Sequence, residues 1–86
     1  MSALINLDEK RIIKALMQGD FKISNHARKR MYERNVLLDD IICCAKTILS
    51  IQQLDGKYVV KGHDRYDDKL TIICAWDGNT LIITLY

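Results

Sequence analysis

The hydrophobic pattern of this chain changes its period once, at Ser50, and this change limits the folds that the chain can adopt. Before Ser50, apolar residues recur at helical spacing, for example at Ile12, Ile13 and Leu16. After Ser50, apolar and polar residues alternate, and β-branched and aromatic types become frequent, as is typical of strands. Helices followed by strands indicate an α+β domain.

The element boundaries can be predicted from turn and capping residues. The pattern predicts three helices, over 8–18, 25–34 and 38–49. It predicts four strands, over 51–54, 57–63, 70–76 and 81–86. Ser24 is a good N-cap for the second helix, and Asn35 tolerates the left-handed conformation common past a helix end. Residues 1–6 are expected to be a loosely packed lead-in and 21–23 an extended connector. We therefore predict two to three N-terminal helices packed on one face of a four-stranded antiparallel sheet.

The length and composition indicate one domain over residues 1–86, with a single modest core. No apolar run approaches the roughly 18 residues that cross a bilayer, and no signal peptide is visible, so no membrane partner is expected. Three cysteines, an odd number, do not indicate a disulfide framework, which favours a cytoplasmic location. Neither histidine has metal-motif spacing and no glycine-rich phosphate loop is present, so neither a metal nor a cofactor is expected.

Alternation assigns the strand residues to two faces. The face expected to pack against the helices holds Tyr58, Val60, Leu70, Ile72, Cys74, Trp76, Leu81, Ile83 and Leu85. The opposite face is expected to hold Val59, Lys61, His63, Thr71, Ile73, Ala75, Ile82, Thr84 and Tyr86. Because this second face is partly apolar, a partner is expected to cover it, but the face also collects nearly all the polar groups of the strands.

Positive charge is concentrated around the second predicted helix. Residues 22–34 carry five basic residues and one acidic residue, a local charge of +4 in a chain of net charge +2. The residues concerned are Lys22, Arg28, Lys29, Arg30 and Arg34, against Glu33. A basic patch on a mildly acidic remainder suits an anionic ligand such as phosphate, nucleic acid or an acidic protein surface.

One stripe of this helix carries side chains suited to RNA cleavage. His26, Arg30 and Arg34 fall at i, i+4 and i+8, beside Ala27 and Met31, which are expected to face the core. Cleavage of RNA through its own 2′-hydroxyl needs a base, an acid and fixed cations for the charge that develops at phosphorus. Imidazole suits both proton transfers near neutrality, and guanidinium groups bind phosphate.

The remaining predicted site residues come from the strands and from the same basic segment. His63 would complete the pair of histidines, and Tyr86 would donate a hydrogen bond or position the substrate. The residues expected to contact nucleic acid without acting in catalysis are Lys22, Arg28, Lys29, Lys61 and Thr84. The alternative is a structural role, in which the arginines pair with Asp39, Asp40 or Glu33 and the histidines are ordinary surface or capping residues.

A resemblance to a known family adds to these observations. The run Ser24-x-His26-Ala27-x-x-Arg30-Met31-x-x-Arg34-Asn35-Val36 resembles the helix S-x-H-A-x-x-R-M-x-x-R-G-[IV] of a small bacterial family of unknown function. The strands at 58–62 and 82–86 extend the resemblance over roughly residues 20–86. Asn35 stands where that family has glycine, which is a mild departure because asparagine also adopts the left-handed conformation.

That family is similar to the superfamily of small nucleases and toxins that includes barnase, EndoU and RelE. The resemblance implies a metal-independent RNA endonuclease of a bacterial toxin–antitoxin pair, held inactive by a cognate antitoxin. By position, it also implies functional roles for His26, Arg30 and Arg34 in the helix and for Thr84 and Tyr86 in the last strand, while His63 follows the matching strand.

A second hypothesis belongs to a different functional class. The chain would be a non-catalytic module that binds nucleic acid or an acidic protein through the basic helix 24–34. In that case, affinity would fall steeply with salt and no single residue would be essential. A homodimer that pairs through Ile73, Ala75 and Ile82 is compatible with either hypothesis.

Overall fold

A computed structural model describes residues 7–86, so the predicted lead-in at 1–6 lies outside the described residues. The described chain has three helices: α1 (Leu7–Gln18), α2 (Asn25–Arg34) and α3 (Leu38–Lys46). It has five strands: β1 (Lys22–Ile23), β2 (Ser50–Leu54), β3 (Lys57–His63), β4 (Lys69–Trp76) and β5 (Thr80–Leu85). Within residues 7–86, no helix is long and apolar enough to cross a membrane.

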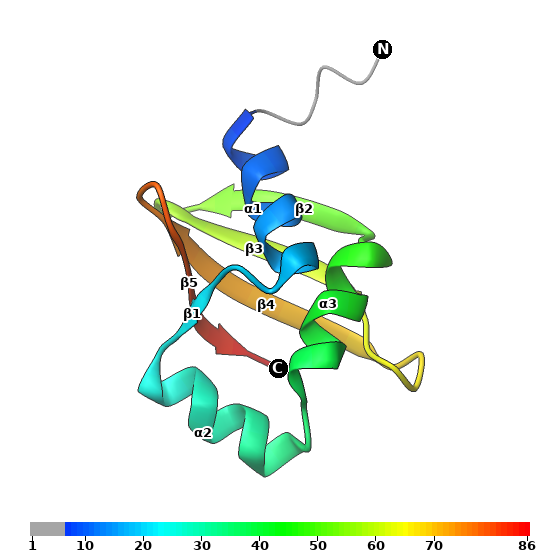
Figure 1. The fold of residues 1–86 in the computed structure, drawn as a ribbon. Coiled ribbons are helices and arrows are strands. Elements are labelled where there is room, and N and C mark those ends of the chain that lie inside the picture. The colour runs from blue at the N-terminus through cyan, green and yellow to red at the C-terminus, as the bar shows by residue number, and fades with distance from the viewer. Residues whose placement is uncertain (1–6) are drawn as a thin grey trace.

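The strands form one mixed sheet in the order β1-β5-β4-β3-β2 (Figure 1). The prediction of an α+β fold is confirmed, but the prediction of four antiparallel strands is wrong, because β1 adds a fifth strand that pairs in parallel with β5. Lys22 and Ile23 pair with Leu81 and Ile82. A strand of two residues has no alternation to recognise, so the sequence pattern indicated only an extended connector there.

Two helices cover one face of the sheet, and the third helix does not. In Figure 1, α1 and α3 lie across the sheet, whereas α2 lies below it, and α2 packs against β5. The prediction that the helices pack on one face of the sheet therefore holds for α1 and α3 but not for α2. The core between α1, α3 and the sheet is formed by Ile12, Leu16, Ile41, Cys44, Ala45, Tyr58, Val60, Leu70, Ile72, Cys74, Ile82 and Leu85.

A β-bulge in β5 changes which of its residues face the core. Cys74 pairs with Ile82 and Ile73 pairs with Thr84, so Ile83 is an extra residue with no partner in β4. Ile82 is fully buried and Leu81 is 38% exposed, so the predicted faces of residues 81–83 are wrong. Beyond the bulge, Leu85 is buried as predicted. The predicted dimer surface also loses Ile82, which lies in the core.

The boundaries of α2 confirm the prediction from its capping residues. The Ser24 hydroxyl accepts a hydrogen bond from the Ala27 amide at 3.0 Å and donates one to the Ile83 carbonyl at 2.7 Å. Asn35 ends the helix with a φ of 55°, in the left-handed region. Ser24 thus fixes both the start of α2 and its position beside β5.

Helix α3 ends at Lys46, earlier than the predicted end at residue 49. The Leu49 amide donates to the Lys61 carbonyl at 2.7 Å, so the chain has already joined the sheet at that point. Leu49 is 63% exposed and does not belong to the buried stripe of α3. Tertiary pairing with β3 therefore overrides the apolar helical pattern at this end of the helix.

Candidate functional site on the open sheet face

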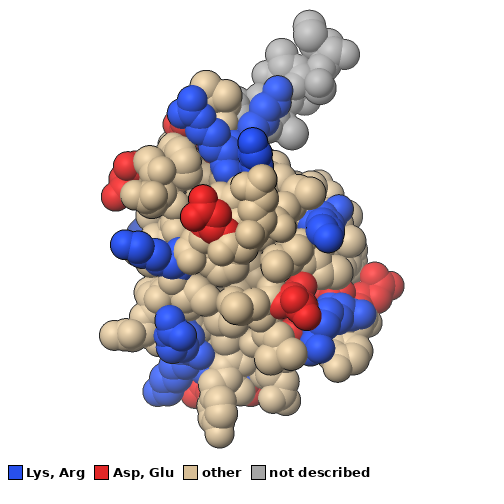
Figure 2. Space-filling view, viewed as in Figure 1, with Lys and Arg blue, Asp and Glu red and all other residues tan. Residues whose placement is uncertain are grey.

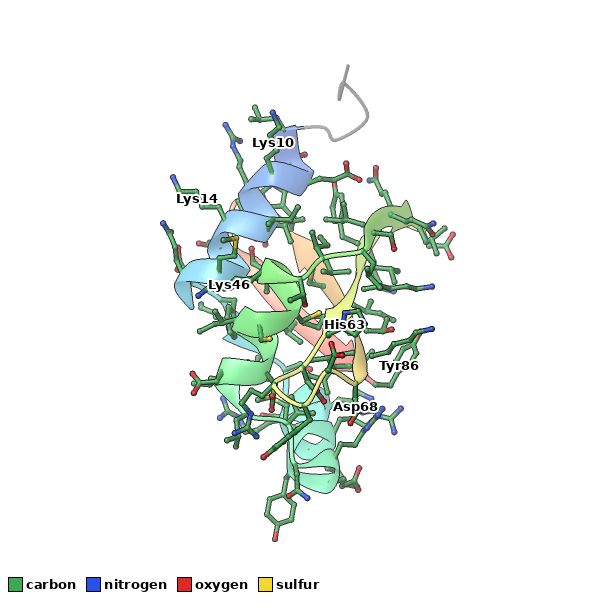
Figure 3. All side chains as sticks on the ribbon, turned by 90° about the vertical axis from the view of Figure 1, so that its right-hand side faces the viewer. Lys10, Lys14, Lys46, His63, Asp68 and Tyr86 are labelled. Atoms are coloured by element: carbon green, nitrogen blue, oxygen red, sulfur yellow. The ribbon has the colours of Figure 1, made fainter. Side chains whose placement is uncertain are left out.

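The sheet face turned away from α1 and α3, here called the open face, carries a row of three polar side chains. Lys61 pairs with Thr71 in the strand register. Thr71 and Tyr86 exchange two backbone hydrogen bonds, of 2.7 and 2.9 Å, so Tyr86 continues the row. Directly paired side chains stand about 5 Å apart on the same face. Figure 3 shows Tyr86 on the side of the sheet away from α1 and α3, and Lys46 on the side of these two helices.

Further polar residues lie one row to either side of Thr71. His63 pairs with Lys69, and Thr84 pairs with Ile73. The structure therefore places Lys61, His63, Thr84 and Tyr86, all predicted site residues, on one face within neighbouring rows. Lys69 is not among the predicted site residues, because the strand was predicted to begin at residue 70, whereas β4 begins at Lys69. Extending the alternation of β4 backwards from Thr71 would have placed Lys69 on this face.

The Thr71 side chain is short and lies between the longer side chains of Lys61 and Tyr86, which leaves space above Thr71. Lysine and tyrosine side chains are long and carry a polar group at the tip, so Lys61 and Tyr86 can converge above the Thr71 hydroxyl. Lys61 is exposed, and Tyr86 is 47% exposed. A phosphate lying over Thr71 would thus meet one cation and two hydroxyl groups.

The end of β3 that carries His63 is held firmly against α3. The His63 amide donates to the Thr47 hydroxyl at 2.9 Å, and that hydroxyl donates to the Cys43 carbonyl at 2.8 Å. Gly62, one residue earlier, is buried against the backbone of Cys44. The site side chains of β3 therefore stand on a rigid base, as a catalytic arrangement requires.

Helix α2 presents two of the predicted catalytic residues beside this face. Arg28 lines a hollow with Leu38 and Ile42 of α3, so its side of α2 faces α3. At about 100° per residue, His26 and Arg30 lie on the opposite side of the helix from Arg28. This opposite side is the one toward the open face, because α3 packs on the other face of the sheet.

The arginines of α2 form no ion pair with an acidic residue in the described part of the chain, residues 7–86. Arg30 Nε is buried without a hydrogen-bond partner in residues 7–86, and the same is true of the Thr84 hydroxyl on β5, against which α2 packs. Arg34 is exposed in the last turn. Asp40, one of the acidic partners considered for these arginines, instead pairs with Arg65 at 2.7 Å. Within the described residues, Arg30 and Arg34 are thus available to an external anion.

The two histidines predicted as an acid–base pair are not brought together. His63 is on β3, whereas His26 is on α2, which packs against β5. Strand β4 lies between β3 and β5, and at about 4.8 Å per strand spacing these two strands are roughly 10 Å apart. His26 lies beyond β5, exposed in the first turn of α2. The two imidazoles therefore do not flank one phosphate.

The predicted nucleic-acid contacts divide between two sides of the molecule. Lys61 and Thr84 belong to the open face, while Lys22 and Arg28 line the hollow on the α3 side. Lys29 is exposed to solvent. Figure 2 views the helix side, where basic side chains lie around the periphery without forming one continuous patch. The open face, flanked by Arg30, is the stronger candidate interface.

The two buried cysteines, Cys44 and Cys74, are unsuited to nucleophilic catalysis. Burial raises the pKa of the Cys44 thiol to about 12, with smaller contributions from Cys43 and Asp64. Burial likewise raises the pKa of Cys74 to about 12. Such thiols stay protonated at neutral pH and act as small core residues. In residues 7–86, no group of three or more histidine, cysteine, aspartate or glutamate side chains is gathered to hold a metal ion.

Comparison with known proteins adds one finding. Residues 23–86, from the end of β1 to the C-terminal residue, match the model of a protein family described as Domain of unknown function (DUF4258). No curated protein and no solved structure matches the chain significantly. Helix α1 precedes the matched region, which contains the whole open face and α2.

Proposed function

The chain belongs to the domain family of unknown function DUF4258, and we propose that its open face binds single-stranded RNA and cleaves it as a toxin-like, metal-independent endonuclease. The observation that carries this proposal is the row Lys61, Thr71 and Tyr86, with His63 one row away. These side chains supply a cation, hydroxyl donors and an imidazole on adjacent strands of one rigid sheet. They are the groups that cleavage through the 2′-hydroxyl requires.

In this mechanism, the scissile phosphate lies over Thr71. The His63 imidazole removes the proton of the 2′-hydroxyl, and the 2′-oxygen attacks phosphorus. The bond to the 5′-oxygen breaks, a 2′,3′-cyclic phosphate forms, and the Tyr86 hydroxyl protonates the departing 5′-oxygen. Lys61 stabilises the charge that develops on the phosphate oxygens. Arg30 and Arg34 of α2 bind neighbouring phosphates and orient the strand.

Variants of the row test the proposal directly. The purified chain is expected to cut single-stranded RNA in the presence of EDTA and to leave 2′,3′-cyclic phosphate ends. His63→Ala is expected to reduce the rate about 100-fold, because a general base contributes at least that factor. Tyr86→Phe removes only the hydroxyl and, because this hydroxyl is the general acid, should also reduce the rate about 100-fold. The rates are measured on a labelled oligoribonucleotide.

Lys46→Ala provides the matched control for Lys61→Ala, because Lys46 is an exposed lysine on the opposite side of the sheet (Figure 3). Lys46→Ala should cut RNA at the wild-type rate, whereas Lys61→Ala should be at least tenfold slower. Full activity of His63→Ala, or no cleavage by the wild-type chain, would refute the enzymatic proposal.

The separation of His26 from His63 favours a second candidate, in which the open face binds RNA or an acidic antitoxin without cleaving RNA. Affinity would then arise mainly from released counterions, and log Kd would rise linearly with log salt. Arg30→Ala should lower the slope by about 1, whereas Arg28→Ala, on the α3 side of the same helix, should leave it unchanged. Fluorescence anisotropy of a labelled oligoribonucleotide at several salt concentrations gives both slopes. Equal effects of the two substitutions would argue against the open face as the interface.

A further inference from the structure

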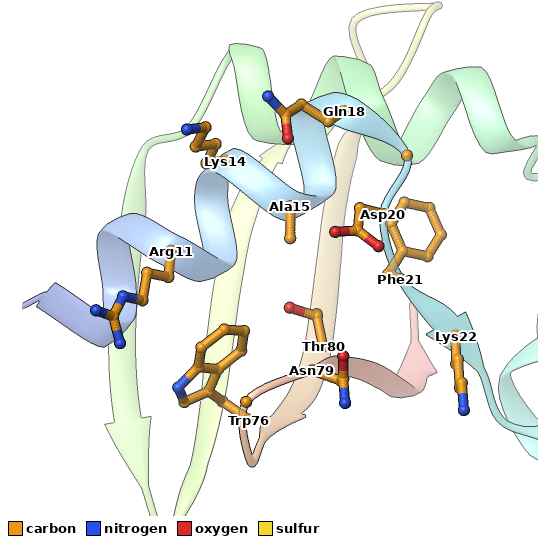
Figure 4. Close-up of a pocket in the computed structure, with 12 residues that line it drawn as sticks. Arg11, Lys14, Ala15, Gln18, Asp20, Phe21, Lys22, Trp76, Asn79 and Thr80 are labelled. Carbon is orange, nitrogen blue, oxygen red and sulfur yellow. The ribbon is translucent and has the colours of Figure 1, made fainter.

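A pocket of about 350 Å³ lies on the helix side of the sheet, away from the open face. Its walls come from the second half of α1, the connection to β1, and the turn between β4 and β5 (Figure 4). Helix α1 precedes the region that matches the family model, so the pocket is lined both by the matched region and by the segment before it. A cavity of this size can enclose a nucleotide-sized molecule.

The floor of the pocket holds a polar atom without a partner. Thr80 is 2% exposed, and its hydroxyl oxygen is buried with no hydrogen-bond partner in residues 7–86. Figure 4 shows Thr80 beneath Ala15, with the Asp20 carboxylate pointing toward the space between them. Buried hydroxyl groups in native proteins are nearly always hydrogen-bonded. A polar ligand in the pocket would supply the missing hydrogen-bond partner of the Thr80 hydroxyl.

The rim of the pocket is basic and one of its walls is aromatic. Arg11, Lys14 and Lys22 line it with one acidic residue, Asp20, and none of these four residues has an ion pair within the described chain. Trp76 forms the wall opposite Asp20 (Figure 4). An indole ring stacks well on planar heterocycles, and mobile basic side chains at a rim bind phosphate.

We propose that this pocket binds a guanine nucleotide. The base lies against Trp76, and the phosphate contacts Arg11, which lies on the same side of the pocket as Trp76 (Figure 4). Guanine alone among the four bases carries two adjacent N–H donors, its ring N1–H and its exocyclic amine, which match the two oxygens of the Asp20 carboxylate. The basic rim disfavours a cationic ligand, and Asp20 disfavours a purely acidic peptide.

The same chemistry is present in a free nucleotide and in a guanosine of an RNA strand. Neither source requires the open face to cleave RNA, so the proposal goes beyond the proposed function and does not rest on it. If an RNA strand is the source, α1 and the β4–β5 turn would add a binding site remote from the row centred on Thr71.

The intrinsic fluorescence of the chain provides a direct measurement, because Trp76 is its only tryptophan. Titration of the full chain with GMP is expected to quench this fluorescence saturably, through stacking on the indole. AMP and UMP should bind at least tenfold more weakly, and inorganic phosphate should not quench. Asp20→Asn should remove the preference for GMP, and Arg11→Ala should weaken GMP binding several-fold.

Two variants separate binding from folding. Thr80→Val keeps the shape but removes the hydroxyl, so it should weaken GMP binding several-fold while the urea midpoint of the free chain stays the same or rises. Lys10→Ala, an exposed lysine of α1 outside the pocket, should bind GMP like wild type.

An oligoribonucleotide with one guanosine distinguishes the two sources. Tighter binding than GMP that is lost in Asp20→Asn identifies RNA, and binding no tighter than GMP identifies the free nucleotide. The absence of saturable quenching by GMP, or identical binding by wild type and Asp20→Asn, would overturn the proposal. Neither result depends on the cleavage assay, so the two proposals can fail separately.

Discussion

Replacing Gly62 by alanine is expected to destabilise the folded chain strongly. A Cβ atom built on Gly62 would overlap the Cys44 carbonyl oxygen and would lie 3.0 Å from the Cys44 carbonyl carbon and 3.1 Å from its Sγ. The main obstacle is backbone of α3, which cannot move aside as a side chain can. Forcing α3 away from β3 opens the core, and we expect a loss of about 3 kcal/mol.

Urea denaturation followed by circular dichroism measures this loss. Lys61→Ala, at an exposed neighbouring position of the same strand, should change the free energy of unfolding by less than about 0.5 kcal/mol. Cys44→Ala should not rescue Gly62→Ala, since it removes Sγ and leaves the carbonyl in place. A stable Gly62→Ala chain, or rescue by Cys44→Ala, would show that the helix does not pack as closely as described.

Gly62 also links packing to the candidate site. It lies between Lys61 and His63, whose side chains point to the open face, while its own missing side chain lets α3 approach. This glycine has no left-handed φ that would require glycine, so nothing local in the sequence indicates its role. Its importance arises from a contact between elements, which periodicity and capping signals do not encode.

Elements with strong local signals could be predicted well. Ser24 and Asn35 are capping residues whose preferences act within one turn, and they gave the bounds of α2 correctly. The alternation of β3 was equally clear, and its predicted bounds, 57–63, are those observed. Both cases depend on interactions between residues close in sequence.

Features that depend on distant pairing could not be predicted. Strand β1 exists because Lys22 and Ile23 meet β5 at the other end of the chain. The bulge at Ile83 falls in the run Leu81, Ile82 and Ile83, where three consecutive apolar residues give no polar position to fix the register.

The candidate site shows the same division between local and distant information. Alternation alone placed Lys61, His63 and Tyr86 on one face of the sheet, and the strand register agrees with this. Whether His26 joins them depends on the strand order, which puts β4 and β5 between His63 and α2. Strand order follows from the packing of the whole chain, so the spacing of the two histidines in sequence carried no information on it.

The second large effect is expected at Asp40, which joins the start of α3 to the turn between β3 and β4. Its carboxylate is buried, with 2% of the residue exposed. One oxygen accepts from the Leu37 amide at 2.8 Å, and the other accepts from the Arg65 amide at 3.0 Å and from Arg65 Nε at 2.7 Å. Asp40→Ala leaves all three donors unpaired. We expect a loss of about 2 kcal/mol, less than for a fully buried ion pair because the Arg65 side chain is 34% exposed.

The contribution of Asp40 should depend on pH in a defined direction. Burial alone would raise its pKa, but hydrogen bonds from the Arg65 side chain and from the Leu37 and Arg65 amides outweigh burial and hold the pKa below the usual 3.8. A carboxyl group whose pKa is lower in the folded chain stabilises folding fully above its unfolded pKa, about 3.9. This stabilisation disappears as the pH falls through the lower, folded pKa.

Urea denaturation at pH 6 and at pH 2.5 should therefore show a large difference between wild type and Asp40→Ala at the first pH and a much smaller one at the second. Asp39→Ala, at the exposed preceding position, should differ little from wild type at either pH. An equal difference between wild type and Asp40→Ala at both pH values would mean that Asp40 stabilises the turn without its charge.

Because Arg65 and Asp64 lie just after His63, the same variant should also loosen the end of β3 and slow any RNA cleavage that depends on His63.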